Sequence, residues 1–330
     1  MQISELSPRA STRSRESLPP IVTVEASDGY PLAVRVHEPN GHARGTLLIH
    51  SATATPQTYY GRFGAWAARC GFRTVTYDYR GIGSSLVGSI RNVDATMTDW
   101  AVLDAAAVLR FARTFGDGLV SIGHSFGGQA MGLSRELHDV DGAIFVGAQL
   151  GYFRHWPLSA QARYATLWYA LFPLTAQLVG YIPKELGMGE DLPRGVALEW
   201  AKWCRSPHYY IDARPEALDL LRAFARPALA YSFSDDAYAP AGAVDAFIGA
   251  FAPARIHHRR LTPAALGVDE MGHFGFFRQA RGGKLWDEAL AFADDVLGGR
   301  PPRVAEIATR EPLGIRLDEI MEDLTFGREE

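Results

Sequence analysis

The stretch Leu119 to Met131, which reads Leu-Val-Ser-Ile-Gly-His-Ser-Phe-Gly-Gly-Gln-Ala-Met, decides the fold. A short apolar run meets the pattern Gly-x-Ser-x-Gly at Gly123 to Gly127 and continues into a helix-compatible segment. This order predicts a strand, a tight turn and a helix, with Ser125 at the apex of the turn. Such a turn strains the serine backbone, and the two flanking glycines leave room for neighbouring backbone. The stretch indicates a nucleophilic serine; the alternative is a Gly-rich turn with a structural serine.

The overall composition is that of a globular protein. With 330 residues, 47% hydrophobic and 21% charged, the chain is long enough for one large α/β domain. A net charge of -4, with Lys and Arg scattered, argues against nucleic-acid binding. Two cysteines, Cys70 and Cys204, are too few to suggest a disulfide framework, so a cytoplasmic location is expected. No apolar run reaches the length of a membrane span.

Strands and helices alternate along most of the chain, which predicts a doubly wound, mostly parallel sheet. The alternation begins with a hairpin at Ser27-Asp28-Gly29 and breaks after the predicted sixth strand, at Leu150. Residues 151–225 show no clear strand and are crowded with large aromatic residues. They predict a helical cap inserted into an α/β core that spans 21–150 and 226–298. Within this cap, Asp191 is expected to cap the start of a helix.

The two ends of the chain are expected to lie outside the core. Residues 1–20 lack the apolar centre of a signal peptide and read as a disordered leader. Residues 299–330 form a tail that ends in a short amphipathic helix pattern, with Leu317, Ile320, Met321 and Leu324 at helical spacing. We expect this helix to pack on the body of the protein or on a second subunit, as in a homodimer.

A serine nucleophile needs a base, and the base needs a carboxylate that orients it. Among the histidines after Ser125, only His273 lies in a loop just after the last predicted strand, where it can reach the carboxyl edge of the sheet. Asp235 and Asp236 follow the predicted strand that ends at Phe233, and we favour Asp236 as the acid. The other aspartate is expected to cap the loop or the following helix.

The negative charge that develops during acyl transfer needs two backbone N–H donors. The first is expected from Phe126, at the start of the helix that follows Ser125. The second usually comes from the loop after the third strand, which here reads His50-Ser51-Ala52-Thr53, so Ala52 is the candidate. His124, beside the nucleophile, is interpreted as a packing or supporting residue with no chemical step.

These motifs together resemble the α/β-hydrolase fold superfamily over roughly residues 21–298. More narrowly, the chain resembles bacterial predicted hydrolases of the serine aminopeptidase and monoacylglycerol-lipase-like branch. The matching pieces are Leu47-Leu48-Ile49-His50, Asp78-Tyr79-Arg80-Gly81-Ile82-Gly83-Ser84, Gly123-His124-Ser125-Phe126-Gly127-Gly128, Asp236 before Pro240, and Gly272-His273. The resemblance implies Ser125 as nucleophile, Asp236 as acid and His273 as base. One departure is Ser51, where the family often has glycine, and it affects the expected shape of the oxyanion loop.

The sequence thus predicts a serine hydrolase that cleaves a carboxylic ester or similar acyl bond of a small molecule, with no metal or cofactor. The cap aromatics suggest an apolar acyl or leaving group, and Trp168, Trp200 and Trp203 are the predicted substrate contacts. They could equally be core residues between cap helices. An acyltransferase, an aminopeptidase and a non-catalytic binding protein on the same frame remain alternatives. A peptidase would need a cap carboxylate for the substrate ammonium, for which the candidates are Glu185, Glu190, Asp191 and Glu199.

Overall fold

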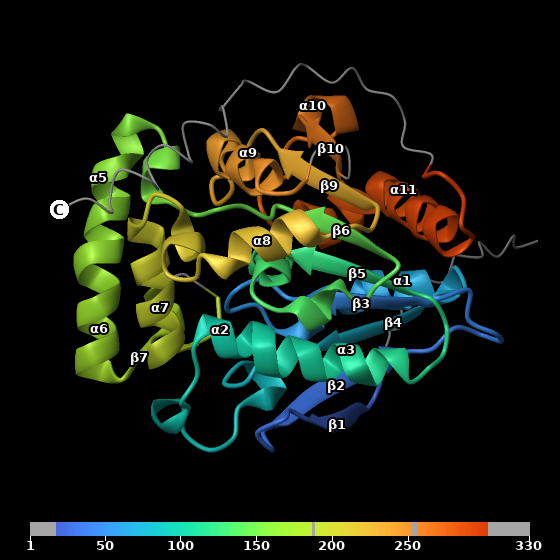
Figure 1. The fold of residues 1–330 in the computed structure, drawn as a ribbon, viewed down its shortest axis with the longest axis horizontal. Helices are drawn as coiled ribbons and strands as arrows, with labels where there is room; N and C mark the ends of the chain where they lie inside the picture. The colour runs from blue at the N-terminus through green and yellow to red at the C-terminus, as the bar shows by residue number, and fades with distance from the viewer. Residues whose placement is uncertain (1–17, 187–188, 253–255, 303–330) are drawn as a thin grey trace, which may run out of the picture.

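The computed structural model describes residues 18–186, 189–252 and 256–302. Its centre is an eight-stranded sheet with the order β1-β2-β4-β3-β5-β6-β9-β10, in which β1 and β2 pair antiparallel and the strands from β4 onward run parallel. Helices lie on both sides of this sheet (Figure 1). The doubly wound, mostly parallel sheet and the hairpin predicted from the sequence are therefore confirmed.

The elements follow one another in the alternation that the sequence predicts. The strands of the large sheet are β1 Ile21–Glu25, β2 Pro31–His37, β3 Thr46–His50, β4 Arg73–Tyr77, β5 Leu119–His124, β6 Gly142–Val146, β9 Ala228–Phe233 and β10 Ile256–Leu261. The α-helices outside the cap are α1 Gly61–Arg69, α2 Met97–Asp99, α3 Ala106–Arg113, α4 Phe126–Gln129, α9 Ala241–Gly249, α10 Pro263–Leu266 and α11 Gln279–Leu297. A π-helical turn, Trp100–Ala105, joins α2 to α3.

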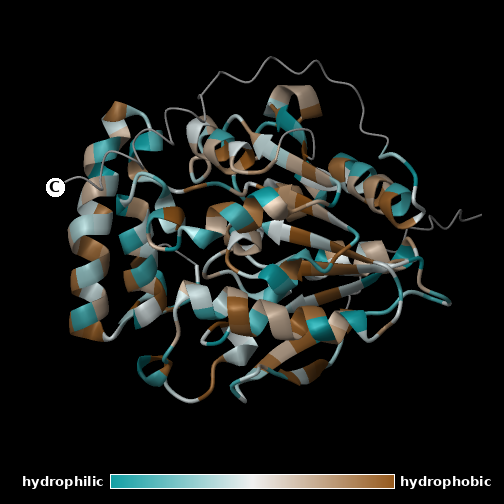
Figure 2. Cartoon of the chain, viewed as in Figure 1, coloured by the Kyte–Doolittle hydropathy of each residue, from teal (hydrophilic) through white to brown (hydrophobic). Residues whose placement is uncertain are grey.

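The central strands are buried on both faces because side chains alternate across a sheet. On β6, Ile144 belongs to one buried cluster together with residues of α1 and α11, whereas its neighbour Phe145 belongs to another, together with residues of α3 and α9. The strands accordingly carry mostly hydrophobic residues where they pass through the middle of the molecule (Figure 2). An apolar layer on each face of the sheet thus holds the strands in place. The strand ends at the carboxyl edge therefore fix where the loops of the site begin.

Asp78, which directly follows β4, is held by hydrogen bonds from two loops. The Asp78 carboxylate accepts hydrogen bonds from the backbone and side-chain N–H groups of Gln57 and from the N–H of Ser84, at 2.6–3.0 Å. Gly83, at φ +47°, passes so close that a Cβ would lie 2.8 Å from this carboxylate. Asp78 therefore ties the loops after β3 and β4 together, and its function is structural.

The cap lies between β6 and β9, at the edge of the sheet toward which the parallel strands point (Figure 1). Its helices are α5 Leu158–Thr166, α6 Phe172–Val179, α7 Arg194–Arg205 and α8 Glu216–Ala223, and a π-helical turn, Leu167–Leu171, joins α5 to α6. Two short strands, β7 Tyr181–Ile182 and β8 Leu192–Pro193, pair antiparallel in the same segment, so the expectation of no strand there is wrong. We propose 151–225 as the cap domain and 21–150 with 226–298 as the core.

One further expectation is wrong, and two others concern residues that lie mostly outside the described ranges. Asp191 does not cap α7, which begins after Pro193; its carboxylate accepts a hydrogen bond from the N–H of Lys184 instead. The predicted tail helix at 317–324 and most of the leader lie outside the described residues. Across the described parts of the chain, no helix is both long and apolar enough to cross a membrane.

Candidate active site

Ser125 stands between β5 and α4 with φ 52° and ψ -115°, a conformation that L-residues rarely adopt. Its N–H donates to the carbonyl of Val146 at 2.9 Å, which fixes the turn to the neighbouring strand β6. Such strain persists only where surrounding structure holds it, and it is typical of functional sites. The local sequence therefore folds into the predicted elbow, with the serine at its apex.

The two glycines of the elbow are required by close backbone contacts. A Cβ at Gly123 would lie 2.5 Å from the backbone nitrogen of Gly128, and one at Gly127 would lie 2.1 Å from the carbonyl oxygen of His50. Contacts this short do not occur in folded proteins, so any larger residue would displace the turn. The explanation of these glycines from the sequence is confirmed.

His273 and Asp236 come together from two different loops, and their side chains are almost fully buried. The Nδ1 atom of His273 lies 2.7 Å from Oδ2 of Asp236. The other carboxylate oxygen, Oδ1, accepts hydrogen bonds from the N–H groups of Tyr238 and Ala239. Burial alone would raise the pKa of the Asp236 carboxyl, but the His273 ring and these N–H groups outweigh it and hold the pKa below its usual range. The carboxylate is thus ionised and oriented toward the imidazole.

The neighbouring Asp235 has a different task. Its Oδ2 atom accepts hydrogen bonds from the N–H groups of Met271 and Gly272, at 2.8 and 3.0 Å. These residues directly precede His273, so Asp235 holds the loop while Asp236 contacts the ring. Gly147, at φ +59°, lies beneath the pair, where a Cβ would be 3.1 Å from the His273 ring. A residue without a side chain is needed there to leave space for the imidazole.

The two predicted oxyanion donors, the N–H groups of Phe126 and Ala52, differ in whether they already have a hydrogen-bond acceptor. Phe126 is the first residue of α4, so its N–H has no acceptor within that helix. The Ala52 N–H, in contrast, donates to the hydroxyl of Tyr60 at 2.9 Å. Ala52 does line the cavity described below, but its donor already has a partner. The sequence could not indicate this, because Tyr60 reaches Ala52 only after the loop between β3 and α1 has folded.

Ser51 stands where the family often has glycine, but its side chain does not occupy the space around Ser125. Ser51 is buried, and its hydroxyl donates to the carbonyl of Tyr77 on β4 at 3.3 Å. The side chain that replaces the family's usual glycine therefore points toward the sheet. The next residues form a turn in which the Thr55 N–H donates to the Ala52 carbonyl and Ala54 has φ 54°.

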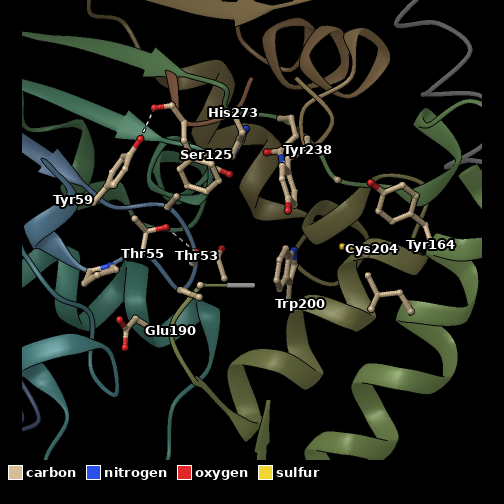
Figure 3. A pocket seen from close by; sticks show the side chains of 18 of the residues that line it. Thr53, Thr55, Tyr59, Ser125, Tyr164, Glu190, Trp200, Cys204, Tyr238 and His273 are labelled. Atoms are coloured by element: carbon tan, nitrogen blue, oxygen red, sulfur yellow. Dashed lines mark hydrogen bonds between the residues drawn. The ribbon is translucent and has the colours of Figure 1, made fainter. Parts of the chain in front are cut away.

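A cavity of about 630 Å³ opens above Ser125 and His273. Figure 3 shows these two residues on one side and Tyr164 and Trp200, from cap helices, on the other. Of the predicted cap contacts, Trp168 and Trp200 line this cavity, but Trp203 does not. Trp203 is 1% exposed and packs against Tyr209 and Tyr210, because its face of α7 is turned to the core; its assignment as a substrate contact is wrong.

Several lining residues were not identified from the sequence. Gln149 and Tyr238 follow the carboxyl ends of β6 and β9, a position that by itself could have indicated them. Trp156 also lines the cavity, and its indole N–H donates to the carbonyl of Ala237, beside Asp236, at 2.8 Å. The cap is therefore hydrogen-bonded directly to the loop that carries the candidate acid.

The cap also contacts the loop after β3. The N–H of Glu190 donates to the carbonyl of Ala54 at 2.8 Å, and Glu190 lines the cavity. Among the four cap carboxylates considered for a substrate ammonium, Glu190 is the one that lines this cavity. Glu199 instead accepts hydrogen bonds from the N–H and hydroxyl of Thr98. Among the described residues, no group of three or more His, Cys, Asp or Glu side chains is placed to hold a metal ion.

A model of the family described as "Alpha/beta hydrolase family" matches residues 46–301, which is most of the chain. The chain belongs to the alpha/beta hydrolase family. Many solved structures of alpha/beta hydrolase architecture share the fold at low identity. A thermophilic esterase from Thermogutta terrifontis has 18% identity and a TM-score of 0.55, with 84% of this chain and 99% of that chain covered. A soluble variant of monoglyceride lipase from Saccharomyces cerevisiae has 14% identity and a TM-score of 0.60, with 89% and 99% covered.

A third structure of this hydrolase fold is the N-formylmaleamic acid deformylase from Pseudomonas putida S16, with 16% identity and a TM-score of 0.53 over 81% of this chain and 100% of that one. No curated protein sequence matches significantly. At these identities the solved structures establish the alpha/beta hydrolase fold. The chemistry has to be argued from this chain's own residues.

Proposed function

We propose that this alpha/beta hydrolase is a serine hydrolase that cleaves a carboxylic ester or similar acyl bond through an acyl-enzyme on Ser125. One observation carries the proposal: the strained Ser125 lines the same cavity as His273, whose Nδ1 atom is 2.7 Å from the Asp236 carboxylate. A serine, an imidazole and a buried carboxylate in this relation form the constellation that activates a hydroxyl for acyl transfer.

The proposed first half-reaction follows from the His273 tautomer. A carboxylate only accepts hydrogen bonds, so Nδ1 carries the proton toward Asp236 and Nε2 is the nitrogen that accepts. His273 Nε2 takes the hydroxyl proton as Ser125 Oγ attacks the acyl carbon. The resulting imidazolium then gives this proton to the leaving oxygen or nitrogen. Asp236 stabilises the imidazolium and keeps the ring in place.

Oxyanion stabilisation is proposed to come first from the Phe126 N–H, at the positive end of α4. Ala52 becomes the second donor if its N–H is shared, as a three-centre bond, between the Tyr60 hydroxyl and the substrate oxygen. In the second half-reaction, water attacks the acyl carbon while His273 takes its proton. The imidazolium then returns this proton to Ser125 Oγ as the bond between Oγ and the acyl carbon breaks and the acid is released. No step in this scheme requires a metal or cofactor.

The substrate is proposed to be a small molecule with an apolar or aromatic part. The cavity volume lies within the usual range for small-molecule sites, about 300–1,000 Å³. Its cap side carries aromatic rings, including Tyr164, Trp168 and Trp200. Solved structures of this fold include proteins named as esterases and a monoglyceride lipase, which is consistent with an ester substrate.

Two other activities use the same three residues. An acyltransferase would pass the acyl group to an alcohol or amine in place of water. An aminopeptidase would need an acid for the substrate ammonium, and the specific observation in its favour is Glu190 at the cavity wall. A glutamine at this position should then abolish cleavage of aminoacyl amides while leaving uncharged esters unaffected.

The deciding experiment combines labelling and turnover. We expect a fluorophosphonate probe to label the wild-type protein and p-nitrophenyl esters of increasing acyl length to show a burst. Ser125→Ala should lose both. An added alcohol acceptor separates transfer from hydrolysis, and aminoacyl amides test the peptidase alternative. Labelling that survives in Ser125→Ala would place the nucleophile elsewhere, and a wild type with neither labelling nor burst would support a binding protein.

A further inference from the structure

Two buried side chains outside the cavity connect the candidate base to the loop after β3. His124 Nε2 lies 2.9 Å from the backbone carbonyl oxygen of His273. His124 Nδ1 lies 2.9 Å from the hydroxyl of Tyr60, and this hydroxyl lies 2.9 Å from the N–H of Ala52. We call these four residues, Ala52, Tyr60, His124 and His273, the Tyr60–His124 relay.

The direction of every hydrogen bond in the relay follows from elementary chemistry. A carbonyl oxygen only accepts, so His124 Nε2 must carry the hydrogen. Because burial lowers the pKa of His124 to about 3, the ring is neutral and Nδ1 accepts the hydroxyl hydrogen of Tyr60. The Tyr60 oxygen then accepts the Ala52 N–H. All donors point one way, from Ala52 through Tyr60 and His124 to His273.

The relay is sealed from water. Tyr60 and His124 are each 0% exposed. Phe277 packs against both rings, with centroids 4.7 Å from Tyr60 and 5.2 Å from His124, and Phe274 contacts the edge of His124. In such a setting a polar group that loses its partner costs about 1–3 kcal/mol, so both loops are held in one arrangement.

We propose that Tyr60 and His124 are positioning residues, which fix the loop that carries His273 relative to the oxyanion loop at Ala52. The inference rests on the proposed function, since it concerns the geometry of that reaction. In the sheet, β5, which leads to Ser125, lies between β3 and β10, which lead to these two loops. Acyl transfer needs the base on one side of the attacked carbon and the oxyanion donors on the other. Neither Tyr60 nor His124 lines the cavity, so they act through the residues that they hold.

If the hydrogen bond between Tyr60 and His124 positions the loops, removing it while keeping the ring packing should lower kcat. If the two residues only fill space, it should not. Tyr60→Phe removes the hydroxyl and keeps the ring contacts. His124→Gln places an amide N–H near the Nε2 position and removes the Nδ1 acceptor. Both variants therefore break the bond between Tyr60 and His124, from opposite sides. A displacement of about 1 Å at a reacting group costs up to about 100-fold, so we expect kcat to fall about 10- to 100-fold.

The test measures kcat and KM with p-nitrophenyl esters, together with melting temperature. We expect KM to change less than about twofold, since substrate contacts remain. The double variant should lose no more activity than the worse single variant, because both changes remove the same interaction. Tyr30→Phe and His138→Gln are matched controls. Their native side chains make the same kinds of bond elsewhere, to the carbonyl oxygens of Ser85 and Met131, and should leave kcat unchanged.

Each outcome decides one question. Wild-type protein without ester turnover refutes the proposed function. Normal wild-type turnover with unchanged kcat in both Tyr60→Phe and His124→Gln refutes the relay alone. An additive double variant, or an equal loss in the two controls, also refutes it. Should Tyr60→Phe fail to fold, His124→Gln carries the same test from the other side of the bond.

Discussion

Replacing Asp236 by asparagine is the sharpest test of the candidate site, because its hydrogen bonds determine how the new amide must lie. In the native protein Oδ1 accepts from the N–H groups of Tyr238 and Ala239, and Oδ2 faces His273 Nδ1. If the asparagine NH₂ faced Tyr238 and Ala239, both N–H groups would lose their acceptor. At about 1–3 kcal/mol each, that arrangement costs about 2–6 kcal/mol.

The amide oxygen of Asp236→Asn therefore keeps the position of Oδ1, and the NH₂ group faces His273. Nδ1 must then accept a hydrogen bond, which moves the imidazole proton to Nε2. A ring with hydrogen on Nε2 cannot take the proton of Ser125. The same exchange lowers kcat about 10⁴-fold in a serine-protease triad, and we expect a loss of that order, equivalent to about 5 kcal/mol of activation free energy.

Asp235→Asn is the matched control. Among the described residues, Asp235 accepts hydrogen bonds at Oδ2, from the N–H groups of Met271 and Gly272, and an asparagine oxygen can make both bonds. We expect less than a tenfold loss in kcat. The assay is single-ester kinetics with melting temperature measured in parallel. Equal losses in the two variants, or a loss below tenfold in a folded Asp236→Asn protein, would refute the tautomer argument.

Three further predictions follow from burial and packing. Burial lowers the pKa values of His50 and His124 from 6.5 to about 3, so their stabilising contribution is complete above pH 6.5 and falls toward pH 3. Urea titrations should show about 1.4 kcal/mol lost per pH unit for each histidine, and His50→Gln should flatten that slope; an unchanged slope contradicts the assignment. Trp203→Ala should cost about 3–5 kcal/mol of stability, with unchanged selectivity between short and long esters, whereas Trp200→Ala should change that selectivity. The reverse result would contradict the placement of Trp203 in the core and of Trp200 at the cavity. Gly147→Ala should lower kcat with little effect on KM, because its Cβ would press on the His273 ring, and unchanged kinetics would show that the ring has room to move.

Much of this alpha/beta hydrolase could be predicted from the sequence because the informative signals are local. The elbow depends on glycines within two residues of Ser125, and a Cβ at Gly123 would collide with the backbone of Gly128 in the same turn. A Cβ at Gly127 would collide with His50 on β3, a contact that only the folded sheet provides. The alternation of strands and helices, set by hydrophobic periodicity, predicted the sheet and put the loops of Asp236 and His273 at one edge. The candidate triad thus followed from motif and order alone, and its catalytic role stays a prediction.

The directions of individual side chains were decided only by the tertiary structure. Asp235 and Asp236 are adjacent and chemically identical, and the packing of two loops alone determines which one meets the His273 ring. In the same way, the packing of α7 turns Trp203 into the core and leaves Trp200 at the cavity.

The hydrogen-bond partner of the Ala52 N–H also could not be predicted from the sequence. It is the hydroxyl of Tyr60, in the turn before α1, and this hydroxyl also bonds to His124 at the end of β5. Contacts of this kind depend on side chains that are distant in sequence and meet only once the sheet has formed. Sequence periodicity records which face of an element is buried, but the partner of each polar atom is determined by the packed fold.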